Sequence, residues 1–562
     1  MTRARVAALL ALAVVLTGCA GVPTSGPIRQ GPVVAPAGED QFIRVIARPP
    51  HDGMTPEEVV SGFEEATASP DAHYTIAREY LTADAATSWD PSAGVLISDA
   101  NGLTMTRQAN VVHADGALSG TIDASGEYAV AAPGSKLSTS YSMELVDGQW
   151  RIASPPDGLV LGPADIDRGF RSFDLYYFTR DFGMLVPAPV IVPLTSSGLA
   201  TALVRSLVAG PTPWIAPAVR TAFPEGTKLA LDSVPVIDGV AQVDLTPQVL
   251  AADDMTRQKL SAQLVWTLRP LPDISGVQIT VNGQPLPVSG VAPIQPVGSW
   301  PLLDPQGLPD QATGYAVDRR GILRVAGDGA LTPVARTKPD LVFPGVSLDS
   351  SKVAGLSADG RSLYEAPLDG TATAVRRYTG TQLSRPSWDR SGAIWFVDRG
   401  TGLVVVQAGK AARVGVGGLP PGVTDASLLS AAVSRDGTRL ALLVRRGTRV
   451  EPMIARIERF GDNVRVTAPR RTESIITEAI DLAWEDADTL AVLGTSGASS
   501  LEVLQLDVGS PQVRRMGAPE GAVTLAAAPG RALLVGTATS VFRNTGSTWT
   551  RVGDAQYPVY PG

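Results

Sequence analysis

Apolar and polar side chains alternate along most of the chain after residue 94, and this period of two predicts β-strands. Residues 240–245 show the alternation well, with every second side chain apolar. The dipeptides Asp147-Gly148 and Asn282-Gly283 lie beside such segments and are typical of two-residue hairpin turns. The pattern therefore predicts a multidomain, mainly β protein with a small number of helices.

The first folded region is expected over residues 51–160. Thr55-Pro56-Glu57-Glu58 combines a capping hydroxyl, a proline in the first turn and a glutamate able to bond back to the cap, which predicts a helix. A second helical stretch is expected over residues 72–87. The expected strands cover residues 95–97, 103–112, 117–122, 128–132, 138–146 and 149–152. This order is similar to the α+β NTF2-like fold, in which helices pack on a curved antiparallel sheet.

A second α+β region is expected over residues 165–292. Its first helix covers residues 199–209 and ends at Gly210-Pro211, and its second covers residues 257–268. Asp253-Asp254 precedes the second helix and is expected to cap it rather than to form an acid–base pair. The segments LVRSLVAGP, FPEGTKL, DGVAQVDL, AQLVWTL and VQITVNG resemble the successive blocks of a GerMN domain.

Residues 300–562 contain an internal repeat. Equivalent turn positions recur at intervals of about 40 to 50 residues without any helical pattern, which is typical of propeller blades. We expect a six-bladed β-propeller, with a β-sandwich as the alternative. The segment 304–309 is rich in proline, so the chain end at residues 554–560 is predicted to join the first blade and close the ring. The equivalent positions are Leu308, Leu348, Trp388, Val433, Trp484 and Ala526.

The first nineteen residues have the layout of a lipoprotein signal peptide. Arg3 and Arg5 precede an apolar run over residues 6–16, which is shorter than the roughly 20 residues that a membrane-spanning helix needs. Leu16-Thr17-Gly18-Cys19 is similar to the bacterial lipobox and predicts cleavage after Gly18. Cys19, the chain's single cysteine, is the expected lipid attachment site, as an N-palmitoyl and S-diacylglycerol cysteine.

The signal peptide of residues 1–18 is followed by an expected Pro/Gly-rich tether over residues 19–50. These features predict a lipid-anchored protein on the extracytoplasmic face of the cell membrane. The formal net charge is −8 and charged residues make up only 18% of the chain, without a concentrated basic segment. A nucleic-acid partner is therefore not expected.

Motifs for catalysis or metal binding are not evident. The three histidines, His51, His73 and His113, lack the spacing of a metal pair, and no G-x-S-x-G elbow occurs. The segment 415–418 departs from a dinucleotide fingerprint at Pro420. We expect no catalytic residue, no metal site and no cofactor, and hence no enzyme.

Several other polar or aromatic motifs are given structural interpretations. The segments 357–360 and 434–437 are interpreted as inter-strand turns rather than calcium loops. The doublets Arg445-Arg446 and Arg470-Arg471 are expected on the solvated rim of the propeller rather than at docking sites. Trp388 and Trp484 are expected to pack between neighbouring blades rather than to face a ligand.

The order of these regions resembles that of the LpqB lipoproteins of actinobacteria, and the start CAGVPTSGPI of the mature chain supports the resemblance. The resemblance implies an accessory protein of the MtrA–MtrB two-component system that contacts the extracytoplasmic part of the sensor kinase MtrB. It also implies a role in cell-envelope homeostasis and division. A protein that binds or processes cell-wall glycan, with a contact to peptidoglycan, is the alternative; a deep funnel lined with paired carboxylates and aromatic rings would favour it.

Overall fold

The computed structural model describes residues 47–69, 73–194, 198–309, 312–461, 463–472, 475–497 and 500–562. Cys19, the signal peptide and most of the expected tether lie outside these residues. The chain is mainly β, and we call its parts the N-terminal region (51–160), the middle region (165–292) and the propeller (300–562). No helix in the described part of the chain combines the length and apolar character needed to cross a membrane.

The N-terminal region begins with α2 (Pro56–Thr67), which starts where the capping box predicted. The backbone N–H of Thr55 donates to Oε2 of Glu58 at 2.7 Å, and the N–H of Glu58 donates back to Thr55 Oγ1 at 3.3 Å. The single helix expected over residues 72–87 is wrong, because the chain forms α3 (Thr75–Arg78) and α4 (Ala83–Ser88) instead. Between them the backbone bonds to Ile152 at both Tyr80 and Thr82, which interrupts the helix.

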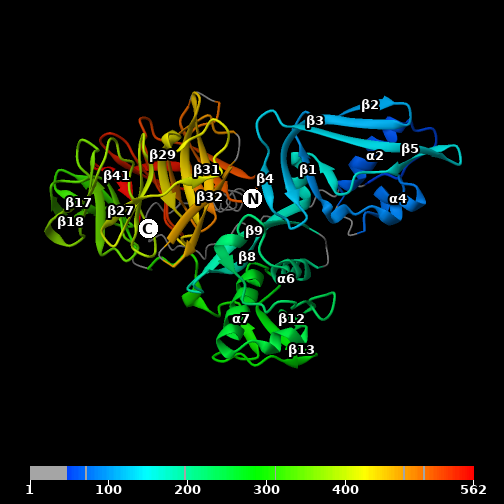
Figure 1. Cartoon of the computed structure of the whole chain (residues 1–562), viewed down its shortest axis with the longest axis horizontal. Helices are drawn as coiled ribbons and strands as arrows, with labels where there is room; N and C mark the ends of the chain where they lie inside the picture. Colours follow the sequence, from blue (N-terminus) through cyan, green and yellow to red (C-terminus); the bar gives the residue numbers. More distant parts are fainter. Residues whose placement is uncertain are drawn as a thin grey trace, which may run out of the picture. The chain divides into compact units, whose positions relative to one another are not determined.

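The sheet of this region has the strand order β6-β5-β3-β1-β7, with β2 and β4 also paired to β3. Both α2 and α4 pack against β6, and Figure 1 shows the two helices, in blue, next to the strands of this sheet. The strand expected over 103–112 is wrong: Ala109 has φ +54°, turns the chain, and separates β2 from a long β3 that absorbs the strand expected over 117–122. The NTF2-like assignment stays a prediction. The strands are β1 (Gly94–Ser98), β2 (Thr104–Gln108), β3 (Val111–Asp123), β4 (Tyr128–Val130), β5 (Lys136–Val146), β6 (Gln149–Ser154) and β7 (Leu159–Leu161).

The middle region contains two small sheets and two longer helices. In one sheet β8 pairs with both β9 and β10, while in the other β12 and β13 run parallel and are connected by α7. Asp253 caps α7, as predicted, by accepting the N–H of Thr256 at 2.8 Å. The elements are α5 (Pro163–Gly169), β8 (Phe170–Thr179), β9 (Leu185–Pro193), α6 (Leu199–Ala209), β10 (Val219–Arg220), β11 (Val236–Ile237), β12 (Val240–Leu245), α7 (Asp254–Leu268), β13 (Gly276–Val281), β14 (Gln284–Pro285) and β15 (Ile294–Pro296).

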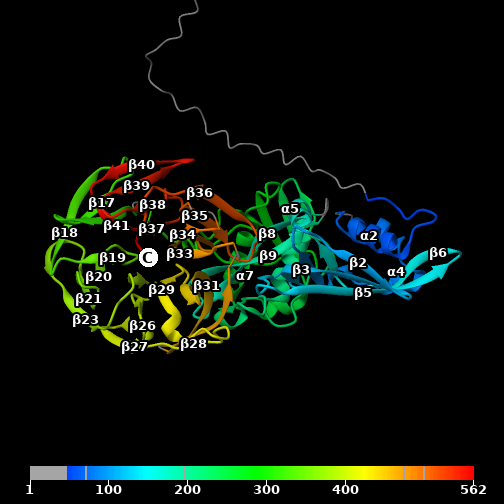
Figure 2. The ribbon, with the colours of Figure 1, turned by 90° about the horizontal axis from the view of Figure 1, so that it is seen from above.

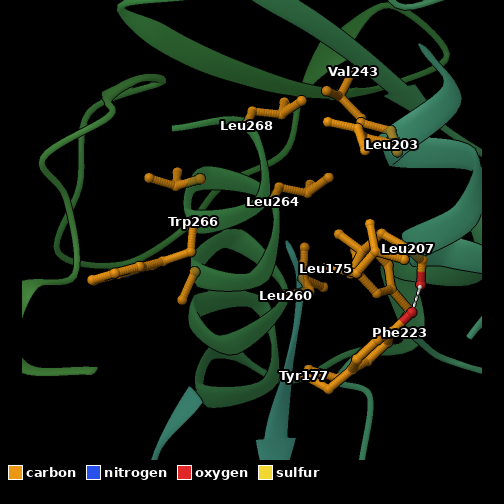
Figure 3. Close-up of a cluster of buried hydrophobic side chains, with 14 of the residues drawn as sticks. Leu175, Tyr177, Leu203, Leu207, Phe223, Val243, Leu260, Leu264, Trp266 and Leu268 are labelled. Atoms are coloured by element: carbon orange, nitrogen blue, oxygen red, sulfur yellow. Dashed lines mark hydrogen bonds between the residues drawn. The ribbon is translucent and has the colours of Figure 1, made fainter. Parts of the chain in front are cut away.

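Leucines of α6 and α7 form the core of the middle region with side chains of β8 and β12 (Figure 3). Leu203, Leu207, Leu260 and Leu264 are fully buried there. The hydroxyl of Tyr177 on β8 donates to the backbone oxygen of Leu207 at 3.3 Å, so its one polar atom is satisfied inside the core. This core fixes β8 and β9, whose other contacts reach the propeller.

The strands of the propeller form four-stranded antiparallel meanders that follow one another around a ring (Figure 2). The meanders are β41-β16-β17-β18, β19-β20-β21-β23, β24–β27, β29–β32, β33–β36 and β37–β40. The predicted closure is confirmed, because the C-terminal strand β41 pairs with β16 and occupies the inner edge of the first sheet.

The bounds of the propeller strands, in chain order, are as follows: β16 (Gly314–Asp318), β17 (Gly321–Val325), β18 (Leu331–Lys338), β19 (Val342–Val346), β20 (Lys352–Leu356), β21 (Ser362–Pro367), β22 (Gly370–Thr373), β23 (Val375–Thr379), β24 (Ser387–Trp388), β25 (Ile394–Asp398), β26 (Gly402–Gln407), β27 (Lys410–Arg413), β28 (Val416–Gly417), β29 (Leu428–Val433), β30 (Arg439–Arg446), β31 (Arg449–Phe460), β32 (Asn463–Arg471), β33 (Glu478–Trp484), β34 (Thr489–Thr495), β35 (Glu502–Asp507), β36 (Val513–Gly517), β37 (Thr524–Ala526), β38 (Leu534–Gly536), β39 (Val541–Thr545), β40 (Thr548–Gly553) and β41 (Gln556–Val559).

Trp388 and Trp484 pack between neighbouring blades, as predicted. Both side chains are buried. The indole N–H of Trp388 donates to the backbone oxygen of Gly345 on β19 at 2.9 Å, and that of Trp484 donates to Ala432 on β29 at 3.0 Å. Each tryptophan therefore joins its own inner strand to that of the preceding blade.

Candidate functional site

The centre of the propeller is filled by its own side chains and by the end of the chain. Arg385 forms an ion pair with Asp481 at 3.2 Å and also donates to the backbone oxygens of Leu482 and Leu525. Arg435 donates to the backbone oxygen of Pro561 at 2.8 Å, and burial lowers the pKa of Arg435 to about 10. The remaining cavity is about 50 Å³.

A cavity of that size is far smaller than the roughly 300–1,000 Å³ of small-molecule pockets. Asp481, the carboxylate at this position, is engaged by Arg385 and by the backbone N–H of Leu525 at 2.8 Å. Burial raises its pKa, while Arg385 opposes that shift. The propeller axis is therefore a structural plug, and this geometry does not favour the glycan-processing alternative.

The three regions meet around one tryptophan, Trp214, which lies in the loop between α6 and the short 3-10 helix Ala216–Ala218. All three belong to the compact unit Val45–Gly562. The indole N–H of Trp214 donates to the backbone oxygen of Ala468 on β32 at 2.8 Å, and Arg456 on β31 donates to the backbone oxygen of Trp214. The backbone N–H of Trp214 donates to Glu127 Oε2 at 3.3 Å.

Arg470 completes this cluster, which we call the Trp214 junction (Glu127, Trp214, Arg456, Ala468 and Arg470). The Nη1 atom of Arg470 lies 2.7 Å from Glu127 Oε1, and the guanidinium carbon of Arg470 lies 4.0 Å from the centre of the Trp214 ring. Burial lowers the pKa of Arg470 to about 10, and Glu127 acts in the opposite direction. One guanidinium, from the propeller, thus contacts both the N-terminal region and the middle region.

The expectation that Arg470-Arg471 lies on the solvated rim is wrong. Arg470 belongs to the Trp214 junction, and Arg471 lies 3.2 Å from Glu451 with both side chains largely buried. The reason is that β32 faces the other two regions, so a polar edge that would be solvated in an isolated propeller is covered here. Arg445 and Arg446, at the end of β30, are exposed as predicted.

A second contact between the middle region and the propeller buries carboxyl groups. Asp174 on β8 lies near Asp488, which precedes β34, and Asp174 Oδ1 is buried without a hydrogen-bond partner among the described residues. Burial raises the pKa of Asp174 to about 7, Arg439 opposes the shift, and the carboxylate of Asp486 adds to it. Burial and Asp174 together raise the pKa of Asp488 well above its ordinary value. Burial therefore favours the protonated form at this pair of carboxyl groups.

Arg439 anchors the same contact from the propeller side. This fully buried arginine forms an ion pair with Asp436 at 3.0 Å and donates to the backbone oxygen of Pro187 on β9. Asp436 belongs to the segment 434–437, and it accepts the hydroxyl of Ser434 at 2.6 Å and the N–H of Thr438 at 2.7 Å. The equivalent Asp359 accepts the hydroxyl of Ser357 and the N–H of Arg361, so both segments are inter-strand turns, as predicted.

Within the N-terminal region, Glu64 on α2 points into the core. The hydroxyl of Tyr141 on β5 donates to Glu64 Oε1, while Oε2 has no hydrogen-bond partner among the described residues. Burial raises the pKa of Glu64 to about 8, partly offset by the Tyr141 hydrogen bond. Glu64 is therefore protonated at neutral pH, which makes it a buried neutral acid rather than a charged one.

The histidines do not converge. His51 Nδ1 lies 3.1 Å from the backbone oxygen of Asp52, and His113 Nδ1 lies 2.9 Å from the hydroxyl of Ser140. Across the residues that the structure describes, no three His, Cys, Asp or Glu side chains form a group able to hold a metal ion. Cys19 lies outside the described residues, so its modification stays a prediction.

Sequence reasoning missed the residues of the Trp214 junction. A lone tryptophan in the proline-rich loop GPTPWIAP is a signal that could have indicated a contact, since large aromatic side chains rarely stay in solvent without a partner. Glu127 and Asp174 carry no such signal. Each follows or lies within an ordinary strand, and its role arises only because two distant segments meet there.

Three family models match successive parts of this chain. The N-terminal domain of lipoprotein LpqB matches residues 49–167, a domain described as sporulation and spore germination matches residues 174–287, and the β-propeller domain of lipoprotein LpqB matches residues 321–561.

Curated relatives match almost the whole chain. Lipoprotein LpqB of Thermobifida fusca is 31% identical over 98% of this chain and 97% of the relative. Lipoprotein LpqB of Mycobacterium tuberculosis is 29% identical over 99% of this chain and 98% of the relative.

Similar solved structures are more distant. TolB from Acinetobacter baumannii is 15% identical over 45% of this chain and 68% of that one, with a TM-score of 0.34. The first GerMN domain of the sporulation protein GerM from Bacillus subtilis is 23% identical over 22% of this chain and 92% of that one, with a TM-score of 0.18. At these TM-scores the likenesses support no inference about function.

Proposed function

Because this chain belongs to the family of LpqB lipoproteins, we propose that it is a membrane-anchored envelope protein that serves as accessory partner of an MtrB-type sensor kinase. In this proposal the chain is cleaved after Gly18, Cys19 carries the acyl chains, and the folded part is held on the extracytoplasmic face. Several acyl chains on one residue anchor a protein durably, whereas a single chain binds only reversibly.

The Trp214 junction is the observation that supports a platform role best. It joins all three regions through hydrogen bonds and an ion pair of largely buried groups. A partner that contacts any one region would therefore meet a surface whose orientation the other two help to fix. Such preorganisation reduces the entropy lost when two proteins associate.

The filled propeller axis supports protein contact over catalysis. Arg385 and Arg435 occupy the place where a funnel for a substrate would be needed. With its axis closed, the propeller offers its rim and faces, and these surfaces suit a protein partner better than a small molecule.

The proposal is tested by crosslinking the tagged full-length protein in envelope membranes and identifying what copurifies. We expect the sensor kinase to copurify with the wild-type protein, and Cys19→Ala to leave the membrane fraction and lose the kinase. Recovery of glycan fragments without any sensor kinase, from a protein that is correctly anchored, would overturn the accessory role.

A further inference from the structure

A cavity of about 660 Å³ lies between the β8–β9 turn of the middle region and the propeller blades formed by β24–β27 and β29–β32. Four arginines contribute to its wall: Arg180, Arg220, Arg390 and Arg459. The volume falls within the range of small-molecule sites, about 300–1,000 Å³. It is about thirteen times the volume left at the propeller axis, as the two cavities measure 660 and 50 Å³.

Three of these arginines have no carboxylate oxygen within 4.0 Å among the residues that the structure describes; Arg459 instead pairs with Asp389 at 2.7 Å. Arg180 donates to the backbone oxygen of Pro217 at 3.0 Å, and its guanidinium carbon lies 4.6 Å from the centre of the Phe460 ring. Arg220 lies over the ring of Phe182, and Arg390 contacts Met184. These contacts position the guanidinium groups without neutralising them.

The carboxylates of the wall do not balance this charge. Asp436 is already paired with the fully buried Arg439 at 3.0 Å. Asp181 accepts the hydroxyl of Thr179 at 2.5 Å and the N–H of Gly183 at 3.1 Å. These hydrogen bonds lower the pKa of Asp181, so it stays ionised and offsets one of the three unpaired arginines. The wall therefore keeps a positive surplus.

Burial lowers the pKa of Arg390, which is the cost of taking a guanidinium out of water, while Asp436 and Asp181 act in the opposite direction. An anion bound beside Arg390 would relieve this cost. Guanidinium groups bind phosphate and carboxylate through paired N–H donors, and three of them from different elements suit a group with several terminal oxygens.

We propose that this cavity, which we call the arginine cavity, binds a phosphate ester, with Arg180, Arg220 and Arg390 contacting the phosphate oxygens. The cavity exceeds what a bare phosphate ion needs, so an organic part of the ligand occupies the remainder. The ring of Phe460, which is 45% exposed, offers an apolar surface for that part. The same chemistry is carried by a soluble phosphate ester and by a phospholipid headgroup.

The test uses the purified full-length protein in a non-ionic detergent and measures binding by calorimetry. One arm titrates glycerol phosphate, and the other titrates detergent micelles containing phosphatidylglycerol against micelles containing phosphatidylcholine. Binding of glycerol phosphate assigns a soluble ester, while binding of phosphatidylglycerol micelles alone assigns a headgroup.

Two variants locate the binding in the cavity. The double variant Arg180→Gln/Arg390→Gln is expected to weaken binding at least tenfold while keeping the wild-type melting temperature without ligand. Arg445→Gln/Arg446→Gln, which changes two exposed arginines elsewhere on the propeller, is the matched control and should bind like wild type. Absence of binding in both arms, or equal loss in both double variants, would overturn the proposal. Kinase copurification is measured separately, so either result leaves the accessory role to its own test.

Discussion

The guanidinium of Arg470 on β32 lies 2.7 Å from the carboxylate of Glu127, which precedes β4 more than three hundred residues earlier in the chain. Both side chains are largely buried, and Trp214 from the middle region stacks on the same guanidinium. The Arg470–Glu127 ion pair, with Trp214 stacked on it, therefore forms only where all three regions are associated.

The variant Arg470→Met should uncouple the N-terminal region from the propeller. It leaves the carboxylate of Glu127 without its positively charged partner, and removing one member of a buried ion pair costs about 3 kcal/mol. We expect faster proteolysis between the regions and faster hydrogen exchange in strands β4 and β32. The exposed Arg446→Met is the matched control and should change neither. If Arg470→Met behaves like that control, the junction does not hold the regions together.

The Asp174–Asp488 contact predicts a pH dependence. Burial raises the pKa of Asp174 in the folded protein to about 7, above its unfolded value of 3.8. The stabilisation tied to its proton is therefore fully present below about pH 4 and is lost as pH rises through 7.

The variant Asp174→Asn removes this titration. Between pH 5 and pH 9, the melting temperature of the lowest thermal transition should fall more for the wild type than for the variant. The expected difference is roughly 2–4 °C, which is what 1 kcal/mol produces in a domain of about 150–250 residues. Parallel curves for the two proteins would show that Asp174 does not keep a proton at neutral pH.

Glu64 predicts a second, separate pH effect in the N-terminal region. Its folded pKa is raised from the ordinary 4.5 to about 8, so the stabilisation tied to its proton is fully present below about pH 4.5 and is lost as the pH rises through 8. Glu64→Gln keeps an oxygen that can accept the Tyr141 hydroxyl, and it should be similar to wild type in stability at pH 4 but more stable than wild type at pH 9. Tyr141→Phe removes the donor and should cost about 1–3 kcal/mol at pH 6. A wild-type advantage over Glu64→Gln at pH 9 would contradict this assignment.

Trp388→Phe should destabilise the propeller selectively. The change removes the hydrogen bond to Gly345 and part of a buried ring, for a cost of about 2 kcal/mol. Chemical denaturation measures the change in the free energy of unfolding, and hydrogen exchange in β19 and β25 shows whether the loss of stability is local to these blades. Val375→Ala, at a side chain 51% exposed on β23, is the control and should stay near wild type. Similar behaviour of both variants would exclude a role of Trp388 in blade packing.

Local sequence signals predicted the elements whose causes are local. The capping box at Thr55, the Asp253 cap of α7 and the packing of Trp388 all follow from spacing and side-chain chemistry within a few residues or one repeat. The break between α3 and α4 could not be predicted in this way, because it depends on backbone pairing with Ile152, about seventy residues away.

The residues of the candidate sites were even harder to predict from local sequence than the helices and strands. Arg470 looked like a rim residue because nothing near it in the sequence indicates Glu127 or Trp214. The arginine cavity likewise gathers Arg180, Arg220 and Arg390 from separate turns and strands. Contacts between regions are set by surfaces that no single segment encodes.

The accessory role is tested most directly by measuring the binding of the purified extracytoplasmic domain of the sensor kinase to the full-length lipoprotein anchored in vesicles. The account predicts saturable binding that Arg470→Met weakens and Arg446→Met does not. No saturable binding to a correctly acylated and folded lipoprotein would contradict it.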